Sequence, residues 1–350
     1  MTGKRANWLF LTMILTHIAV SLFLSFFGGY IRISTIASFF LGEAVLMGPA
    51  LLFLLFSRTA QQPVPNGAVA APGGFMSVPQ PVRPTAFRRI KISTLLMIAL
   101  ATVLLMPLVT VLNTLTLFFT DNAVAAMEGN ILSLPFPVML FMIGIFGPFC
   151  EEFVFRGMIY GSYGSGLLPI LLSAFLFGLM HMNFNQAVYA FAIGVFLAIL
   201  VEAAGSLWAS VFCHMFFNSY EVVMMYLSKA VLGSEYMEAV SEAAELTSAQ
   251  LQTALAVYLL IAAVTTPIAL CCVAWIAKNE GRQEAVLALF RRQSSRAAGQ
   301  GPSMGGYQGA LQPEPSMSGQ QEPQESLITV PLIVAAVLCL GFMSLEWFLL

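Results

Sequence analysis

The amino-acid sequence predicts an all-α membrane protein, a polytopic bundle of transmembrane helices. Its composition is the first observation: 59% of the 350 residues are hydrophobic and only 9% are charged. Soluble domains carry about 25% charged residues, so the composition argues against a soluble globular domain. The second observation is that apolar stretches recur along the whole chain. Many of them reach the length of about 20 residues that a helix needs to cross a bilayer.

These apolar stretches predict about nine membrane spans, with eight as the alternative. They lie at roughly 7–29, 36–56, 92–119, 135–161, 167–182, 185–203, 206–228, 251–277 and 327–350. The fifth and sixth stretches are short. We expect them to tilt, or to be sheltered by neighbouring helices rather than by lipid.

The charges of the connecting segments predict which side of the membrane each segment faces. The N-terminus is basic, and the 57–91 and 278–326 connections each contain five Lys or Arg residues. The 120–134 connection has two acidic residues and no basic one, and the 229–250 connection has four Glu and one Lys. With nine spans and a cytoplasmic N-terminus, every strongly basic segment falls on the cytoplasmic side, as the positive-inside rule requires. We expect a multi-pass cell membrane protein, in a bacterial inner membrane because no eukaryotic sorting signal is visible.

The chain divides into three regions. Residues 1–129 contain N-terminal transmembrane helices with a flexible cytoplasmic loop at 57–91, residues 130–230 form a core, and residues 231–350 contain C-terminal helices with a flexible linker at 278–326. The linker prediction rests on composition, since 60–85 is rich in Pro, Gly, Ala and Val and 293–326 in Gln, Ser, Gly and Pro. The 234–250 stretch predicts a short amphipathic helix. No phosphate-binding loop or basic–aromatic surface is visible, so we expect no nucleic-acid partner.

The core region places charged residues in an apolar span, in the stretch FCEEFVFRG at 149–157. Ionisable side chains at the centre of a membrane helix cost about 2.5–3.5 kcal/mol each, so they need a protein or watery surrounding. Glu152 and Arg156 are four residues apart and can form an ion pair on one helix face. Glu151 is rotated by about 100° and points elsewhere, which leaves it free to act as a base. A charge cluster that only packs helices or lines an ion path is the alternative interpretation.

Two histidines fall within the following spans. Phe177 and His181 share one helix face, and so do His214 and Asn218. A single histidine in an apolar helix is usually a hydrogen-bonded core residue. Together with Glu151, however, these residues supply a base, imidazoles and hydrogen-bond donors, which are the groups needed to attack a carbonyl with water.

Other acidic residues in or near the spans are weaker candidates. Glu43 and Glu202 lie near span ends, where we expect their side chains to reach the membrane interface. Glu221 follows Asn218 by three residues and is not assigned to the site.

The three motifs resemble those of the CPBP family, the CAAX protease and bacteriocin-processing intramembrane proteases, also called the Abi family, which is related to the type II CAAX prenyl endopeptidases. The hallmarks of this family are Glu-Glu-x-x-x-Arg, Phe-x-x-x-His and His-x-x-x-Asn (or Asp), in that order on separate transmembrane helices. The corresponding segments here are Glu151-Glu152-Phe-Val-Phe-Arg156, Phe177-Gly-Leu-Met-His181 and His214-Met-Phe-Phe-Asn218. The resemblance covers about residues 130–225.

The resemblance implies an intramembrane endopeptidase that cuts a membrane-associated peptide or protein near its C-terminus, with a prenylated CAAX protein as one possible substrate. Its partners would be membrane lipid and this membrane-anchored substrate. Carried over by position, the resemblance makes Glu151 the base on water, assisted by His181, with His214 and Asn218 stabilising the oxyanion. The remaining motif residues would give structural support: Glu152, Arg156 and Phe177.

Zinc is the one cofactor that the motifs leave open. Glu151, His181 and His214 could hold it, but the chain lacks the His-Glu-x-x-His signature of helix-borne zinc proteases. A catalytic zinc usually takes three protein ligands. Using these three would leave only Glu152 as a base, and the ion pair occupies Glu152. We therefore expect no metal, with zinc as the alternative.

Two other functions remain open. A proton-coupled transporter could use the same ionisable residues as a relay, although no internal repeat typical of transporters is visible. A non-catalytic immunity or scaffold protein could retain the family fold, although the three intact motifs argue against this.

Overall fold

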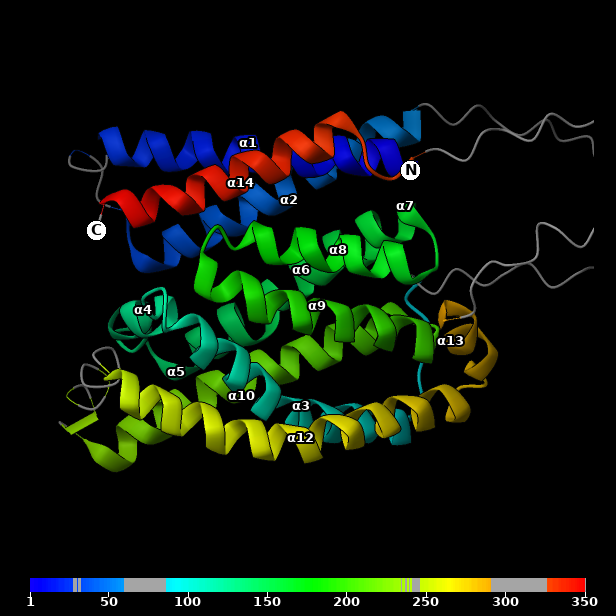
Figure 1. The fold of residues 1–350 in the computed structure, drawn as a ribbon. Helices are drawn as coiled ribbons and strands as arrows, with labels where there is room; N and C mark the ends of the chain where they lie inside the picture. Colours follow the sequence, from blue (N-terminus) through cyan, green and yellow to red (C-terminus); the bar gives the residue numbers. More distant parts are fainter. Residues whose placement is uncertain are drawn as a thin grey trace, which may run out of the picture.

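The computed structural model describes residues 1–27, 30, 33–59, 86–233, 235, 236, 238, 240, 246–290 and 326–349. The described residues form helices and connecting turns, without strands (Figure 1). In chain order the helices are α1 (Gly3–Phe27), α2 (Thr35–Thr59), α3 (Ile92–Thr116), α4 (Ala123–Ile131), α5 (Phe136–Met139), η1 (Leu140–Phe146), α6 (Gly147–Glu152), η2 (Phe153–Tyr160), α7 (Gly161–Tyr163), α8 (Leu167–Met180), α9 (Phe184–Ala204), α10 (Leu207–Leu232), α12 (Ser248–Asn279), α13 (Gln283–Phe290) and α14 (Val330–Leu349).

The predicted polytopic helical bundle is confirmed. Within the described residues, six helical segments are long and apolar enough to cross a membrane: Gly3–Phe27, Thr35–Phe56, Ile92–Thr116, Phe136–Tyr163, Phe184–Ala204 and Ser248–Asn279. Two shorter apolar helices occupy Leu167–Met180 and Val330–Leu345. These eight segments coincide with eight of the nine predicted stretches. The remaining stretch, 206–228, coincides with the 26-residue α10. The chain is therefore a multi-pass membrane protein, and nine crossings stay a prediction.

The predicted flexible segments are only partly within the structure. The 60–85 segment and residues 293–325 lie outside the described residues, as does most of the amphipathic helix predicted at 234–250. In the first part of the flexible linker predicted at 278–326, the structure has helices, and the flexibility stays a prediction. There, α12 continues to Asn279 and α13 forms at Gln283–Phe290. Glu284 in the first turn suits the positive end of the α13 dipole.

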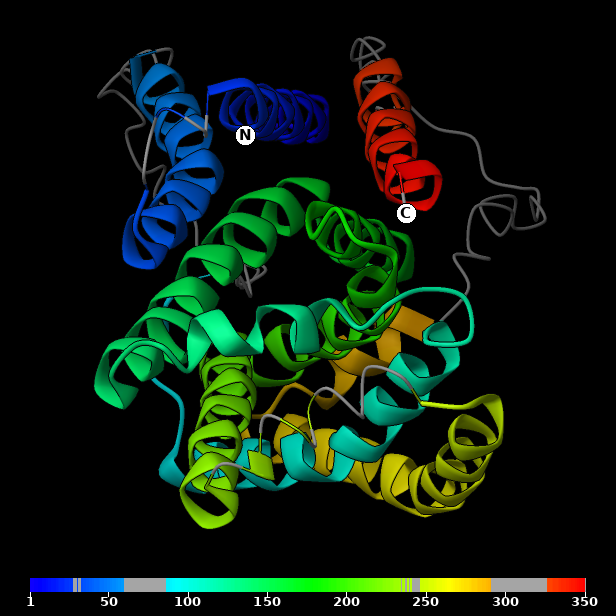
Figure 2. The same cartoon turned by 90° about the vertical axis from the view of Figure 1, so that its left-hand side faces the viewer.

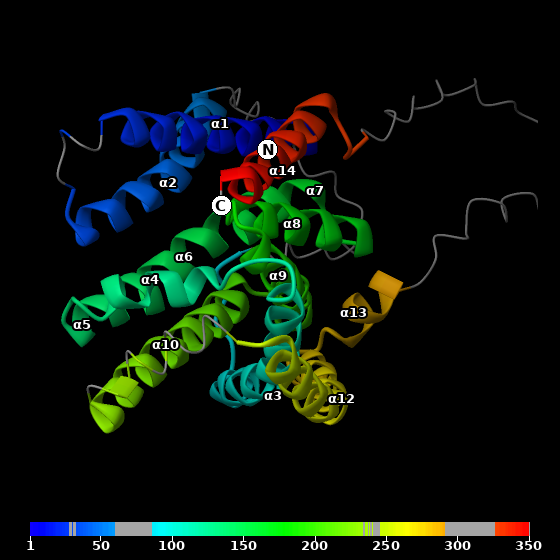
Figure 3. The ribbon, with the colours of Figure 1, turned by 60° about the vertical axis from the view of Figure 1, so that its left-hand side comes forward.

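The helices pack around the core region in an order that differs from their order in the chain. Figures 2 and 3 show α1, α2 and α14 on one side of α6, α8, α9 and α10, with α3 and α12 on the opposite side. One hydrophobic cluster joins buried residues of α1, η2, α8 and α14, and another joins α3, α9, α10 and α12. These contacts link helices from all three regions predicted from the sequence, 1–129, 130–230 and 231–350. The boundaries of the three regions stay predictions.

The α8–α9 hairpin depends on two glycines that allow close approach. A Cβ added at Gly178 would lie 2.7 Å from the carbonyl oxygen of Ala187 on α9. A Cβ at Gly194 would lie 3.0 Å from the Cα of Ala174 and 3.2 Å from a guanidinium nitrogen of Arg156. The missing side chains therefore bring α8, α9 and η2 into contact.

The helical segment from Phe136 to Tyr163 contains two π-helical stretches, η1 and η2, on either side of α6. At the end of η1 the backbone N–H of Gly147 bonds to the carbonyl of Met142, five residues earlier. Pro148 follows and has no N–H to offer the carbonyl of Gly144, four residues before it. The Ser219 hydroxyl on α10 donates to this carbonyl at 3.2 Å. The unusual backbone thus supplies an acceptor that fastens α10 to this segment.

Gly144 sets the distance between η1 and α10. A Cβ added at Gly144 would lie 2.7 Å from Oγ of Ser219 and 3.2 Å from its Cα. We expect Gly144→Ala to push α10 away and to lower the free energy of unfolding by about 1–3 kcal/mol, the usual cost of overpacking. Thermal unfolding in detergent measures this change.

Gly341→Ala is the matched control, because a Cβ at Gly341 on α14 would meet nothing within 4 Å. It should leave stability unchanged or raise it slightly, since alanine is the better helix former. Equal unfolding temperatures for the two variants would contradict the proposed close approach at Gly144.

Candidate active site

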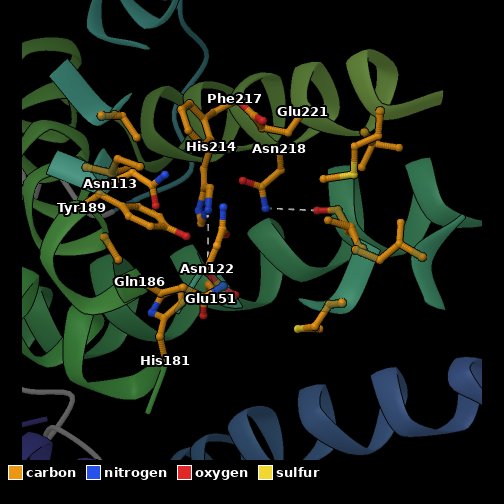
Figure 4. A pocket seen from close by; sticks show the side chains of 18 of the residues that line it. Asn113, Asn122, Glu151, His181, Gln186, Tyr189, His214, Phe217, Asn218 and Glu221 are labelled. Carbon is orange, nitrogen blue, oxygen red and sulfur yellow. Dashed lines mark hydrogen bonds and ion pairs between the residues drawn. The ribbon is translucent and has the colours of Figure 1, made fainter. Parts of the chain in front are cut away.

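A cavity of about 540 Å³ lies between α3, α6, α8, α9 and α10. The four predicted catalytic residues all line it, namely Glu151, His181, His214 and Asn218. They come from three helical segments: α6, the C-terminal end of α8, and α10. Figure 4 shows their side chains directed into the same space.

The ion pair predicted from the sequence is present beneath the cavity. Nη1 of Arg156 donates to Oε1 of Glu152 at 2.6 Å, and both side chains are fully buried. Nη2 of Arg156 donates to the carbonyl oxygen of Gly194 on α9 at 3.2 Å. The guanidinium carbon also lies 4.3 Å from the centre of the Phe177 ring, a cation–π contact. The Arg156 side chain therefore contacts α6, α8 and α9.

His214 is oriented by the same ion pair. Its Nδ1 lies 3.0 Å from Oε1 of Glu152. A carboxylate that is paired with Arg156 can only accept a hydrogen bond, so Nδ1 carries the hydrogen. The other ring nitrogen, Nε2, lies 3.7 Å from Oε2 of Glu151. Glu152 thus fixes the ring so that Nε2 faces the carboxylate on the cavity wall.

His181 is held by its own helix. Its Nδ1 lies 2.9 Å from the carbonyl oxygen of Phe177, which can only accept, so this nitrogen is the donor and Nε2 is left for the cavity. The Phe177 ring lies edge-on between the two imidazoles, with its centre 5.0 Å from that of His181 and 5.7 Å from that of His214. In the described chain the ion-pair contact of Glu151 is with His214, although the resemblance pairs Glu151 with His181.

Asn218 is positioned by the π-helical backbone of η1. Its Nδ2 donates to the carbonyl oxygen of Ile143 at 3.2 Å, one residue before the carbonyl that Ser219 binds. An amide nitrogen carries two hydrogens, so the second one remains for a group in the cavity.

The described residues do not fit a metal site. No group of three or more His, Cys, Asp and Glu side chains in the described parts of the chain is placed to hold an ion. Nδ1 of each active-site imidazole has a protein partner, on Glu152 for His214 and on Phe177 for His181, which leaves Nε2 of each ring facing the cavity. The set of Glu151, His181 and His214 that the sequence left open for zinc does not form such a group, and the absence of a catalytic metal stays a prediction.

Some acidic residues take positions that the sequence did not predict. Glu43 does not reach the interface: its Oε1 lies 3.1 Å from where a Cβ of Gly147 would be, and its Oε2 is buried without a hydrogen-bond partner. Glu202 is also buried, and it accepts hydrogen bonds from Ser165 and Tyr160.

The cavity has a further group of polar lining residues, most of which the sequence did not predict. Its residues come from α3, α9, α10 and the α3–α4 connection, and they are Asn113, Asn122, Gln186, Tyr189 and Glu221 (Figure 4). Buried Asn185 orients Asn113 by donating to its Oδ1 at 2.8 Å. No motif marks these positions in the sequence.

Comparisons with known proteins match the region that forms this site. Residues 133–220 match a family model described as Type II CAAX prenyl endopeptidase Rce1-like. The resemblance predicted from the three motifs is therefore confirmed for these residues, which contain all three.

Two curated relatives match a similar share of the chain. One is YdiL of Bacillus subtilis (strain 168), to which a membrane peptidase activity has been attributed; it is 29% identical over 91 residues, 25% of this chain and 37% of YdiL. The other is MroQ of Staphylococcus aureus (strain USA300), named as a membrane-embedded CAAX protease; it is 27% identical over 105 residues, 27% of this chain and 42% of MroQ. The matches thus span less than half the length of either relative. No solved structure matches the chain.

The buried ion pair makes a prediction about stability. Arg156→Met would leave the Glu152 carboxylate buried without its counter-charge, and breaking such a pair costs about 3–5 kcal/mol. The double variant Glu152→Gln/Arg156→Met should recover part of this loss, because no charge is then left buried. Thermal unfolding of the purified variants in detergent measures both effects.

Arg89→Met is the control for loss of a guanidinium, because Arg89 is exposed. We expect a change within about 0.5 kcal/mol, as for other surface substitutions. An Arg156→Met variant as stable as Arg89→Met would show that the buried pair does not hold the helices together.

Proposed function

We propose that this chain is an intramembrane endopeptidase, which hydrolyses a peptide bond of a membrane-associated substrate with water activated by Glu151. One observation carries the proposal. A carboxylate, two imidazoles and an amide, contributed by three helical segments of a membrane bundle, line a single cavity. The matches to membrane peptidases over residues 133–220 support the same class of protein.

The contact between Glu151 and His214 supports a binding site for the attacking water molecule. With Nδ1 of His214 protonated, its Nε2 and Oε2 of an ionised Glu151 are both acceptors, 3.7 Å apart. One water molecule can donate a hydrogen to each of them. Its oxygen then directs a lone pair into the cavity, toward a substrate carbonyl. His214 would thus position the water, and this differs from the role that the resemblance implied.

Hydrolysis at this site follows the usual course of general acid–base catalysis. Glu151 takes one proton as the water oxygen bonds to the carbonyl carbon, which gives a tetrahedral oxyanion. The second N–H of Asn218 can donate to this oxyanion, and so can His181 in its doubly protonated form. The intermediate collapses by breaking the C–N bond, and Glu151 returns the proton to the leaving amine. The proton balance closes without a further reactant.

The finer assignment of the substrate is part of the proposal. Cleavage near the C-terminus of a prenylated CAAX protein is suggested by the family match and by the name of MroQ, a CAAX protease. The family model matches only residues 133–220, and the MroQ match covers 27% of this chain. The cellular location proposed for this activity is a bacterial inner membrane.

Removing the proposed base should abolish cleavage without unfolding the protein. Glu151→Gln keeps the size of the side chain and removes its basicity, so we expect cleavage to fall about 10²–10⁴-fold. The assay follows the products from a panel of prenylated and unprenylated peptides by mass spectrometry, with unfolding temperature as the check on folding. Glu235→Gln is the matched control, because Glu235 is exposed and does not line the cavity. Full cleavage by purified Glu151→Gln would remove Glu151 as the base.

A second prediction concerns metal. Because the described site residues do not group as metal ligands, we expect EDTA and 1,10-phenanthroline to leave the cleavage rate unchanged. The rate is measured on protein dialysed against each chelator, with and without added zinc. Loss of activity that zinc restores would overturn a metal-independent mechanism.

A further inference from the structure

The two ends of the helical bundle carry opposite charge. At the basic end, which includes the starts of α1 and α3 and the end of α12, lie Lys4, Arg5, Arg88, Arg89, Lys91, Lys278 and Arg282. The acidic end includes α4 and the last turn of α10, and its acidic residues include Asp121, Glu128, Glu235 and Glu238. Figure 1 shows α7 and α13 at one end of the bundle and α4 and α5 at the other.

The cavity extends from the middle of the bundle, where Glu151 and His214 lie, toward the acidic end. On the acidic side of Glu151 and His214, its lining comes from the C-terminal turns of α3, from α4, from the end of α8, from the first part of α9 and from the middle of α10. None of the described lining residues belongs to the connections at the basic end, 163–167, 204–207 and 278–290. The lining reaches the surface at the acidic end, where Met127 is 54% exposed and Glu221 is exposed.

Among the described residues, the lining of the cavity contains carboxylates but no Lys or Arg. Among the described lining residues the ionisable groups are Glu151, Glu221 and the two imidazoles, and the rest are amides, hydroxyls and apolar groups. The sequence has no Lys or Arg at 117–135 or at 230–250, two of the connections at this end, while the 28–34 connection between α1 and α2 contains Arg32. Lys229, beside the second connection, donates to the carbonyl of Leu132 at 3.0 Å.

This lining is unsuited to a free carboxylate. A C-terminal carboxylate is normally held by Arg or Lys, or by a nest of backbone N–H groups, and like charges in a partly desolvated cleft repel. A peptide segment that is neutral, or that carries a basic side chain, meets no such penalty. The positive-inside rule then places the acidic end, and with it the cavity entrance, on the extracytoplasmic side.

We propose that the cavity accepts a neutral or basic internal peptide segment that enters from the extracytoplasmic side, with Glu221 at the entrance as the residue that selects for positive charge. The proposal rests on the endopeptidase activity inferred above and narrows its substrate class. In this substrate preference the chain would differ from enzymes that bind the free C-terminal carboxylate of a substrate on the cytoplasmic side.

The side of entry is tested by cysteine labelling in spheroplasts and in inverted membrane vesicles. Met127→Cys lies at the cavity entrance, and Arg89→Cys lies at the basic end. A membrane-impermeant maleimide should label Met127→Cys in spheroplasts and Arg89→Cys only in inverted vesicles. The wild-type chain gives the background from its native thiols, including exposed Cys271. The reverse labelling pattern would place the entrance in the cytoplasm and overturn the proposal.

The charge preference is tested with peptides that differ at one position flanking the scissile bond, carrying Lys, Gln or Glu. Wild-type protein should cleave the Lys peptide fastest and the Glu peptide slowest. Glu221→Gln should reduce the ratio of the Lys to the Gln rate about fivefold, as expected for a partly exposed charge pair. Glu235→Gln, which removes a carboxylate from the same end but outside the cavity, should leave the ratio unchanged.

The outcomes separate this proposal from the proposed function. If wild-type protein cleaves none of the peptides while it is folded, the endopeptidase assignment fails. If it cleaves them but prefers Glu, requires a free C-terminal carboxylate, or keeps its preference in Glu221→Gln, the activity stands and the substrate proposal is wrong.

Discussion

The arrangement of the site depends on one buried ion pair. Glu152 and Arg156 are both inaccessible to solvent, and each contacts groups on other helices as well as its partner. Arg156 bonds to the backbone of α9 and stacks on Phe177 of α8, while Glu152 bonds to His214 of α10. Taking two charges out of water is costly and is offset only when geometry and further hydrogen bonds are favourable. The pair is therefore stable only when α8, α9 and α10 pack against the segment that carries it. The same packing directs Nε2 of His214 toward Glu151.

The π-helical backbone of η1 provides the second constraint. Because Pro148 has no N–H, it cannot bond to the carbonyl of Gly144 four residues earlier, and the wide turn also presents the carbonyl of Ile143. Two neighbouring side chains of α10, Asn218 and Ser219, donate to these oxygens. The irregular backbone of η1 thereby fixes the register in which α10 packs against it. It places Asn218 on the wall of the cavity, in the same helix as His214.

The ion pair and the α10 register make the two sides of the cavity chemically different. On one side, Glu151 and the imidazoles have defined orientations and can hold water and carry protons. On the other, amides and Glu221 offer hydrogen bonds without positive charge. In the proposed function, Glu151 and the imidazoles would carry out the reaction, while the amides and Glu221 would contact the peptide.

The sequence by itself determined the elements and the local pairing. Apolar length predicted helices at all nine stretches, and the four-residue spacing of Glu152 and Arg156 predicted their ion pair, because both are properties of a single helix. Only the tertiary structure decided the contacts between helices: that His214 is the imidazole beside Glu151, that Glu202 is buried, and that Glu221 reaches the cavity. Such contacts depend on how closely the helices pack and in what register. Glycines and backbone carbonyls on facing helices determine both, and the periodicity of a single helix does not reveal them.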